Sequence, residues 1–136
     1  MIFYPLGDGS EYGVSVGYAK YMENIVIPAY YNGKPVTTIL EYGFVNVNMS
    51  GAIMDNITLK SITIPEGIKK IEAYAFAGCG QLENINIPKT VEEIGEDAFY
   101  GVQKVTFKFT EAEFNAKGLN VDAIGAGEIE YKPDVI

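Results

Sequence analysis

The chain has 136 residues, a formal net charge of −8, no histidine and one cysteine. This length predicts a single domain over residues 1–136. Nucleic acids and anionic membranes repel an acidic chain, so neither is expected as a partner. The absence of histidine removes the usual acid–base group and the commonest metal ligand, and one cysteine cannot form an internal disulfide.

The sequence contains no run of 18 apolar residues, so we expect no transmembrane helix and no direct membrane insertion. Residues 1–5 have neither the basic region nor the apolar region of a signal peptide. Taken alone, these two observations favour either an intracellular protein or a trimmed chain.

Residues 1–22 are predicted to form a β-hairpin that caps the N-terminal end of the fold. Asp8-Gly9 is a typical tight-turn pair. After this turn, apolar and small residues alternate with the period of two that is typical of a half-buried strand. The alternating apolar residues are Tyr12, Val14, Val16 and Tyr18.

Residues 23–61 form an expanded first repeat unit with two inserts. The insert within residues 29–35 contains Asn32-Gly33, a turn signal that predicts a small protruding loop. A second insert lies within residues 45–56. Insertions in repeat proteins map to loops on one face, which is often the binding face.

The next two units repeat each other at an offset of 23 residues. Ile62 corresponds to Ile85, and Phe76 corresponds to Phe99. A fixed period in the twenties is typical of a solenoid, in which one unit cannot bury its apolar face alone. The predicted fold is therefore a β-rich solenoid whose repeats cover residues 23–107.

Each coil is expected to carry a strand whose first and third residues point inward and whose middle residue points outward. The middle residues are Val26, Thr63, Asn86 and Thr106. Prolines are predicted to close three of the strands, where they lose no ladder donor: Pro28, Pro65 and Pro88. One phenylalanine per coil is predicted to stack in a buried column: Phe44, Phe76 and Phe99.

Cys79 lies six residues before Ile85, and Asn56 lies six residues before Ile62. A cysteine and an asparagine at the same repeat position suggest a buried ladder in which the side chain satisfies backbone groups of a loop. We expect this structural role for Cys79, because the chain has no histidine to activate a thiol nucleophile.

The repeat pattern changes after residue 107. Thr110 and Glu113 form a capping-box pattern and Gly118 is a helix-stop signal, so a short helix is predicted over residues 111–117. The other expectations for this end are a flexible turn at 125–127, a last strand at 128–131, and a C-terminal cap over 108–136.

The segment ITIPEGIKKIEAYAFAGCGQLENINIP closely resembles the BspA-like leucine-rich repeat family, a bacterial surface-protein type with 23-residue repeats. IVIPAYYNGKPVTTI resembles its expanded first repeat, and the resemblance covers residues 1–107. Leu40 stands where glycine is usual, Gly43 replaces alanine, and the fourth coil is truncated.

The resemblance implies a curved, right-handed solenoid with strands on more than one edge. It also implies a cell-surface or secreted protein that binds host proteins, matrix proteins or other cells. No catalytic residue and no cofactor carry over from the family.

The predicted function is a non-catalytic protein-interaction or adhesion module. Tyr42 and Tyr74 occupy equivalent positions two residues before the core phenylalanine, and exposed tyrosines are good binding anchors. The other candidate binding residues are Tyr30 and Tyr31 in the first insert, and the in-register column of Thr37, Lys69 and Glu92.

Three other functions compete with this one. A carbohydrate-binding module would use tyrosines flanked by amides such as Asn46, Asn48 and Asn56. A glycosidase would need paired carboxylates, but Glu92-Glu93 and Glu96-Asp97 lie at solvent-facing repeat positions. A spacer within a larger surface protein would lack a binding hot spot. A monomer, or a weak end-to-end dimer, is expected.

Overall fold

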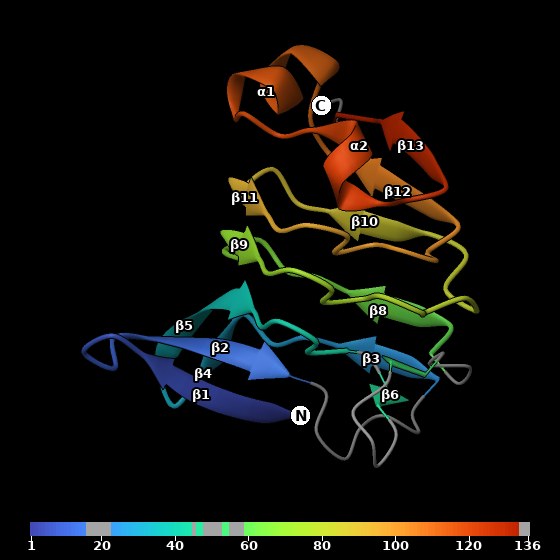
Figure 1. Cartoon of the computed structure of the whole chain (residues 1–136). Coiled ribbons are helices and arrows are strands. Elements are labelled where there is room, and N and C mark those ends of the chain that lie inside the picture. The colour runs from blue at the N-terminus through green and yellow to red at the C-terminus, as the bar shows by residue number, and fades with distance from the viewer. Residues whose placement is uncertain (16–22, 45, 48–52, 55–58, 134–136) are drawn as a thin grey trace.

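The computed structural model describes residues 1–15, 23–44, 46–47, 53–54 and 59–133. The chain winds into a β-solenoid of about four turns, with β1 and β13 at opposite ends of the stack (Figure 1). The elements are β1 Ile2–Leu6, β2 Glu11–Ser15, β3 Asn24–Val26, β4 Tyr30–Tyr31, β5 Lys34–Ile39, β6 Asn46–Val47, β7 Ile53–Met54, β8 Ser61–Thr63, β9 Lys70–Ile71, β10 Ile85–Ile87, β11 Glu93–Ile94, β12 Lys104–Phe107, α1 Glu111–Ala116, α2 Val121–Ile124 and β13 Glu128–Tyr131.

One side of the solenoid is a sheet in which β5, β9 and β11 run parallel in successive coils. Ile39 pairs with Ile71, which pairs with Ile94, so equivalent residues of the repeat lie side by side. The N-terminal hairpin extends this sheet, because β2 pairs in parallel with β5 and β1 pairs antiparallel with β2.

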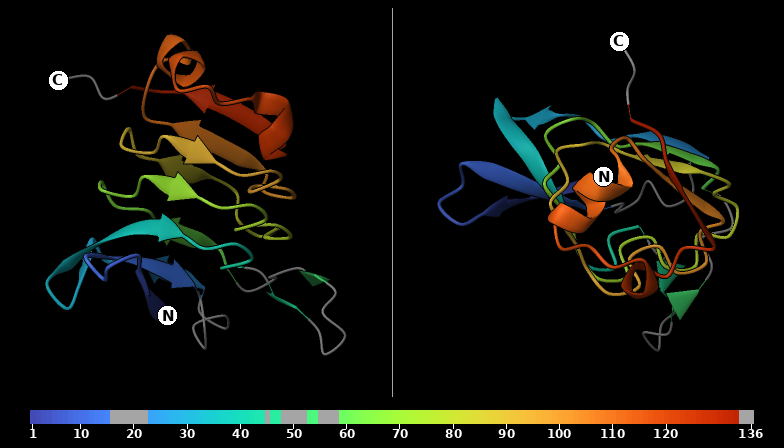
Figure 2. Two further views of the ribbon diagram at one scale, coloured as in Figure 1. Left: turned by 60° about the vertical axis from the view of Figure 1, so that its left-hand side comes forward. Right: turned by 90° about the horizontal axis from the view of Figure 1, so that it is seen from above.

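The opposite side carries separate parallel pairings: β3 pairs with β8, β10 pairs with β12, and β12 pairs with β13. Strands therefore occupy more than one edge of each coil. Seen from above, the coils overlie one another, and the β1–β2 and β4–β5 hairpins extend away from the stack (Figure 2).

The core lies inside the coils and is built from the inward residues of the repeat. Ile25 and Ile27 are 2% and 1% exposed, whereas Val26 between them is 67% exposed. Ile62 with Ile64 and Ile85 with Ile87 repeat this burial in the next two coils. Strand alternation places the first and third residues inside, as the sequence predicts.

Three phenylalanines form the predicted column through the coils. The rings of Phe44 and Phe76 lie 5.3 Å apart between centroids, and those of Phe76 and Phe99 lie 5.7 Å apart with a 4° interplanar angle. All three side chains are fully buried. Offset stacking of this kind adds to the stabilisation that comes from burying the ring area.

The fourth outward position departs from the prediction, because Thr106 is only 4% exposed. β12 lies between β10 and β13, and the Thr106 hydroxyl donates a hydrogen bond to Asn84 Oδ1 at 2.8 Å. The neighbouring strands and this hydrogen bond account for a buried polar residue at a position that is solvent-facing in the earlier coils.

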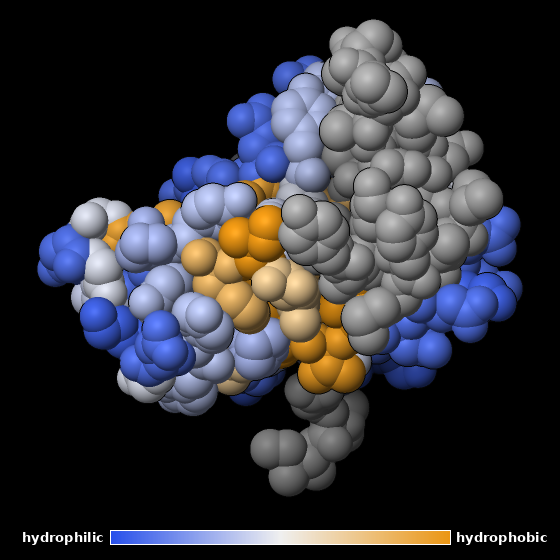
Figure 3. Space-filling view, turned by 90° about the horizontal axis from the view of Figure 1, so that it is seen from below, coloured by the Kyte–Doolittle hydropathy of each residue, from blue (hydrophilic) through white to orange (hydrophobic). Residues whose placement is uncertain are grey.

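The N-terminal hairpin has its turn at Asp8-Gly9, as predicted. The predicted strand residues Val16 and Tyr18 lie outside the described residues. The insert at 29–35 also forms a hairpin, with β4 antiparallel to β5 and Asn32 and Gly33 both at positive φ. Viewed from the end of the stack that carries the N-terminal hairpin, apolar side chains gather near the middle of the exposed face (Figure 3).

The second insert contains an antiparallel pair, β6 with β7. The remainder of residues 45–56, including Asn48 and Asn56, lies outside the described residues. Neither helix in the described part of the chain has the length and apolar character that crossing a membrane requires.

The C-terminal segment begins with the predicted helix, α1, which has a complete capping box between Thr110 and Glu113. Residues 125–127, where a turn is predicted, lead into β13. Gly125 ends a second helix, α2, in a left-handed conformation with φ 78°. β13 then pairs with β12, which confirms the last strand.

Candidate interaction surface

Tyr42, Tyr74 and Asp97 occupy the same position in three successive turns of the solenoid, and each has a left-handed backbone. Their φ angles are 55°, 57° and 50°. This conformation costs an L-residue about 1–2 kcal/mol and is uncommon for bulky side chains. Aspartate is one of the residues best tolerated there, but tyrosine is not.

Hydrogen bonds between coils hold these turns in the left-handed conformation. The Tyr42 N–H donates to the Ala73 carbonyl at 3.3 Å, and the Tyr74 N–H donates to the Glu96 carbonyl at 3.0 Å. The Asp97 N–H makes the equivalent bond to a carbonyl of α2 at 2.6 Å. The backbone ladder therefore sets the position of each side chain that projects from a turn.

The two tyrosine rings stack on each other at the surface. Their centroids are 5.2 Å apart and the rings are nearly parallel, with an interplanar angle of 4°. Tyr42 is 43% exposed and Tyr74 is half-buried. We refer to Tyr42 and Tyr74 together as the tyrosine pair, a rigid aromatic surface of the kind enriched in binding hot spots.

Three carboxylates act on Tyr74 of the tyrosine pair. The negative charge of Glu96 raises the pKa of the Tyr74 phenol above its ordinary value, and desolvation and the charges of Asp97 and Glu41 act in the same direction. An anion is harder to form where the local potential is already negative. Negative charge is therefore concentrated beside Tyr74.

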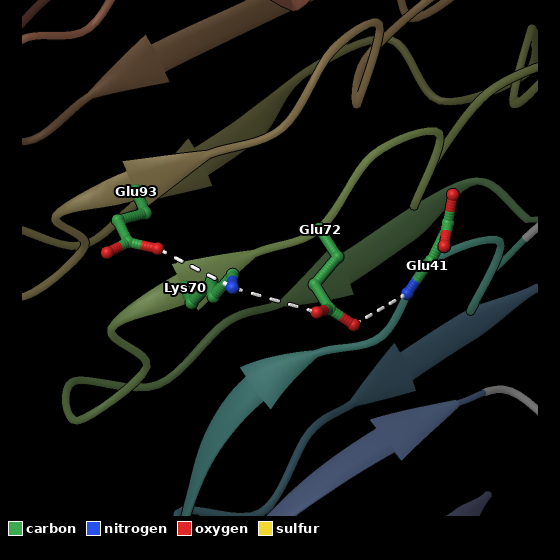
Figure 4. A network of polar contacts seen from close by, with 4 residues as sticks. All are labelled: Glu41, Lys70, Glu72 and Glu93. Carbon is green, nitrogen blue, oxygen red and sulfur yellow. Dashed lines mark hydrogen bonds and ion pairs between the residues drawn. The ribbon is translucent and has the colours of Figure 1, made fainter.

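A polar network links this region to the adjoining sheet (Figure 4). Lys70 Nζ lies 3.8 Å from Glu72 Oε2 and 3.6 Å from Glu93 Oε2. Glu72 Oε1 accepts a hydrogen bond from the Glu41 N–H at 3.1 Å. The Lys70 ammonium is thus engaged by one carboxylate of its own coil, that of Glu72, and by one of the next coil, that of Glu93.

Tyr30 and Tyr31 lie on β4, beside the first residues of β5, away from the tyrosine pair that follows the ends of β5 and β9. Tyr30 is 68% exposed. The Tyr31 ring stacks on Phe3 at 4.1 Å and meets the edge of Tyr12 at 5.1 Å. Tyr31 therefore joins the two hairpins while remaining 39% exposed, and Tyr30 is the more exposed member of this predicted pair.

The prediction that Thr37 is an outward binding residue is wrong, because its side chain is 2% exposed. The register of β2 against β5 shifts at this point. Tyr12 pairs with Val36 and the next residue, Gly13, pairs with Thr38, so Thr37 is skipped in the pairing with β2. Such a bulge re-aims a side chain. The Thr37 hydroxyl donates to Glu11 Oε1 at 2.5 Å.

Lys69 and Glu92, the other members of that predicted column, are exposed. Their backbones are in the predicted register, because the Glu92 N–H donates to the Lys69 carbonyl at 2.8 Å. They precede β9 and β11, whereas the tyrosine pair follows β5 and β9. The structure therefore separates the predicted binding residues into two groups at opposite ends of one sheet.

A family model of the BspA-type leucine-rich repeat region, in six copies, matches residues 48–118, which is more than half of the chain. The chain belongs to the BspA-type leucine-rich repeat family. Its first and last residues extend beyond the matched repeats. No curated protein matches the chain.

Two solved structures resemble this leucine-rich repeat chain. A leucine-rich repeat protein of T. pallidum aligns with a TM-score of 0.42 and 18% identity, over 98% of this chain and 80% of that one. The pneumococcal vaccine antigen PcpA aligns with a TM-score of 0.39 and 19% identity, over 75% of this chain and 35% of that one. At these levels neither likeness bears on function.

A groove with a volume of about 260 Å³ lies at the C-terminal end of the repeats, between Glu92–Ile94 and residues 117–120. Lys117 forms part of its wall, with Nζ donating to the carbonyls of Lys89 and Val91 at 2.9 Å. In the described part of the chain, no three acidic or cysteine side chains are grouped so as to hold a metal.

Sequence reasoning aligned the two tyrosines but missed the left-handed backbone beneath them, the network through Lys70 and the groove. The sequence does contain one signal for the left-handed backbone. Asp97 occupies the tyrosine position in the next coil, and aspartate is enriched in left-handed conformations.

Proposed function

We propose that this chain is a non-catalytic protein-interaction module of a cell-surface or secreted protein, with the tyrosine pair at the centre of its binding surface. The observation that carries the proposal is the stacking of two tyrosine rings at a surface position, with Tyr42 43% exposed. Membership in the BspA-type leucine-rich repeat family supports the surface setting.

The left-handed backbone strengthens this assignment. Two residues with a poor preference for the conformation occupy it in adjacent coils. Local strain of this kind concentrates at functional sites, where the surrounding structure maintains it. In this chain the inter-coil hydrogen bonds maintain it, and the result is a pre-organised aromatic surface.

The test is binding of the immobilised chain to a panel of purified extracellular-matrix proteins and to a glycan array. The double variant Tyr42→Ala/Tyr74→Ala is compared with Tyr100→Ala, which removes a tyrosine that is 63% exposed and outside the pair. Circular dichroism and urea unfolding confirm that each variant folds.

Saturable binding to a protein that the double variant loses and Tyr100→Ala retains supports the proposal. Protein binding that the double variant retains would rule out this surface. Binding to glycans alone would favour a carbohydrate-binding module, and a chain that binds neither panel would fit a spacer.

A further inference from the structure

We propose that the partner group received by the tyrosine pair is a cationic side chain, above all an arginine, presented by an exposed loop of the protein partner. Its guanidinium would stack on the exposed tyrosine surface and pair with the carboxylates of Glu41, Glu96 and Asp97. This inference rests on the proposed function and names the chemistry that the surface recognises.

The arrangement of charge is the first argument. Of the charges that raise the pKa of the Tyr74 phenol, that of Glu96 acts most strongly, and those of Asp97 and Glu41 act in the same direction. Within the described residues, none of these three carboxylates forms an ion pair, since the ion pairs found there involve other acidic side chains. An approaching cation would find negative charges that no lysine of the described chain neutralises.

The position of Lys70 is the second argument. It lies on the adjoining strand β9, where Glu72 and Glu93 engage its ammonium group (Figure 4). Glu72 also accepts a hydrogen bond from the backbone N–H of Glu41. This bond fixes the Glu72 carboxylate on the sheet side of the surface. The lysine is thereby kept on the sheet and leaves the tyrosine pair accessible to a cation from outside.

The aromatic surface is the third argument. An aromatic face attracts a cation through its quadrupole, and arginine stacks on such faces more often than lysine does. The two rings are already parallel, so a planar guanidinium can extend the stack without rearranging them. A partner group carrying negative charge would instead meet repulsion from the surrounding carboxylates.

The experiment is a titration of the full ¹⁵N-labelled chain, followed by NMR, with the peptide Ac-Gly-Arg-Gly-Arg-Gly-NH₂. The matched probe replaces both arginines with citrulline, which keeps the shape and removes the charge. We expect saturable shifts at Tyr42, Tyr74 and Asp97, and affinity for the citrulline peptide lower by about ten-fold or more.

Variants then locate the site. Glu41→Gln/Glu96→Gln should weaken binding of the arginine peptide several-fold and reduce its dependence on salt. Glu83→Gln removes an exposed carboxylate from another part of the repeat. This variant should leave both the affinity for the arginine peptide and its salt dependence unchanged. Tyr42→Ala/Tyr74→Ala should abolish the saturable shifts.

Equal affinity for the arginine and citrulline peptides, or shifts confined to the groove near Glu92 and Glu93, would overturn the inference. If the tyrosine pair were still required for binding a protein of the matrix panel, the proposed function would stand and only the cationic partner would be refuted. If neither the arginine peptide nor a matrix protein required the tyrosine pair for binding, the surface itself would be refuted.

Discussion

The thiol of Cys79 donates a hydrogen bond to the backbone carbonyl of Phe44, with 3.2 Å between sulfur and oxygen. The two residues belong to adjacent coils and both are fully buried. A buried carbonyl that finds no donor costs stability, so this bond helps a loop to enter the core. The contact gives Cys79 the structural role that its repeat position predicts.

Cys79 should be protected from thiol reagents in the native protein. A reagent such as a disulfide-exchange dye should react roughly a hundred-fold or more slowly in buffer than in denaturant, because reaction requires local opening of a core loop. Cys79→Ala should also lower the free energy of unfolding by about 1 kcal/mol through loss of the hydrogen bond. Rapid labelling without denaturant would contradict the buried ladder.

Phe76 is the central ring of the phenylalanine column and contacts a ring on each side. Phe76→Ala should lower the free energy of unfolding by about 3–5 kcal/mol, because a large buried side chain leaves a cavity between two coils. Urea unfolding measures the change. Tyr100→Ala, which truncates an exposed ring, is the control and should change stability little.

Gly95 lies where two coils approach each other too closely for a side chain. A Cβ atom at this position would overlap the backbone nitrogen of Ala73 and lie 2.7 Å from its Cα. Gly95→Ala should therefore destabilise the fold by about 1–3 kcal/mol, since backbone cannot move aside as a flexible side chain can.

Gly80→Ala is the matched control, because a Cβ there meets nothing within 4 Å. Its stability should stay within about 0.5 kcal/mol of the wild type. Thermal and urea unfolding of both variants check the pair of expectations. Equal effects at the two glycines would show that the contact between coils does not limit residue size at Gly95.

Glu113 should make the stability of the C-terminal segment depend on pH. Hydrogen bonds from the backbone and then the side chain of Thr110 hold the pKa of the Glu113 carboxyl below its usual range. A carboxyl whose pKa is lower in the folded state stabilises the fold above its unfolded pKa, and this contribution disappears as the pH falls through the folded pKa.

The difference in unfolding free energy between wild type and Glu113→Gln should therefore shrink as the pH falls from about 7 to about 3. Urea unfolding at each pH measures it. In a Thr110→Ala background the hydrogen bonds from the threonine side chain are absent, so the pH dependence of the Glu113→Gln effect should be smaller. A difference that stays constant with pH in the wild-type background would refute the assignment.

Much of the repeat architecture could be predicted because its signals are local and recur. Ile62 and Ile85 point inward because strand alternation, repeated at a fixed offset, leaves the same positions apolar in each coil. The capping box at Thr110 and Glu113 likewise depends on residues three positions apart. Helix α2 was missed because four residues are too few to show helical periodicity.

The candidate surface depended on contacts that no short stretch of sequence contains. Thr37 repeats the position of Lys69, yet a strand from the N-terminal hairpin pairs beside it with a shifted register and buries it. The tyrosines at 42 and 74 align in sequence, but hydrogen bonds to the following coil impose their left-handed backbone. Periodicity determines which side chains enter the core of each coil, whereas pairing between distant segments determines which of the remaining side chains reach solvent and in what orientation.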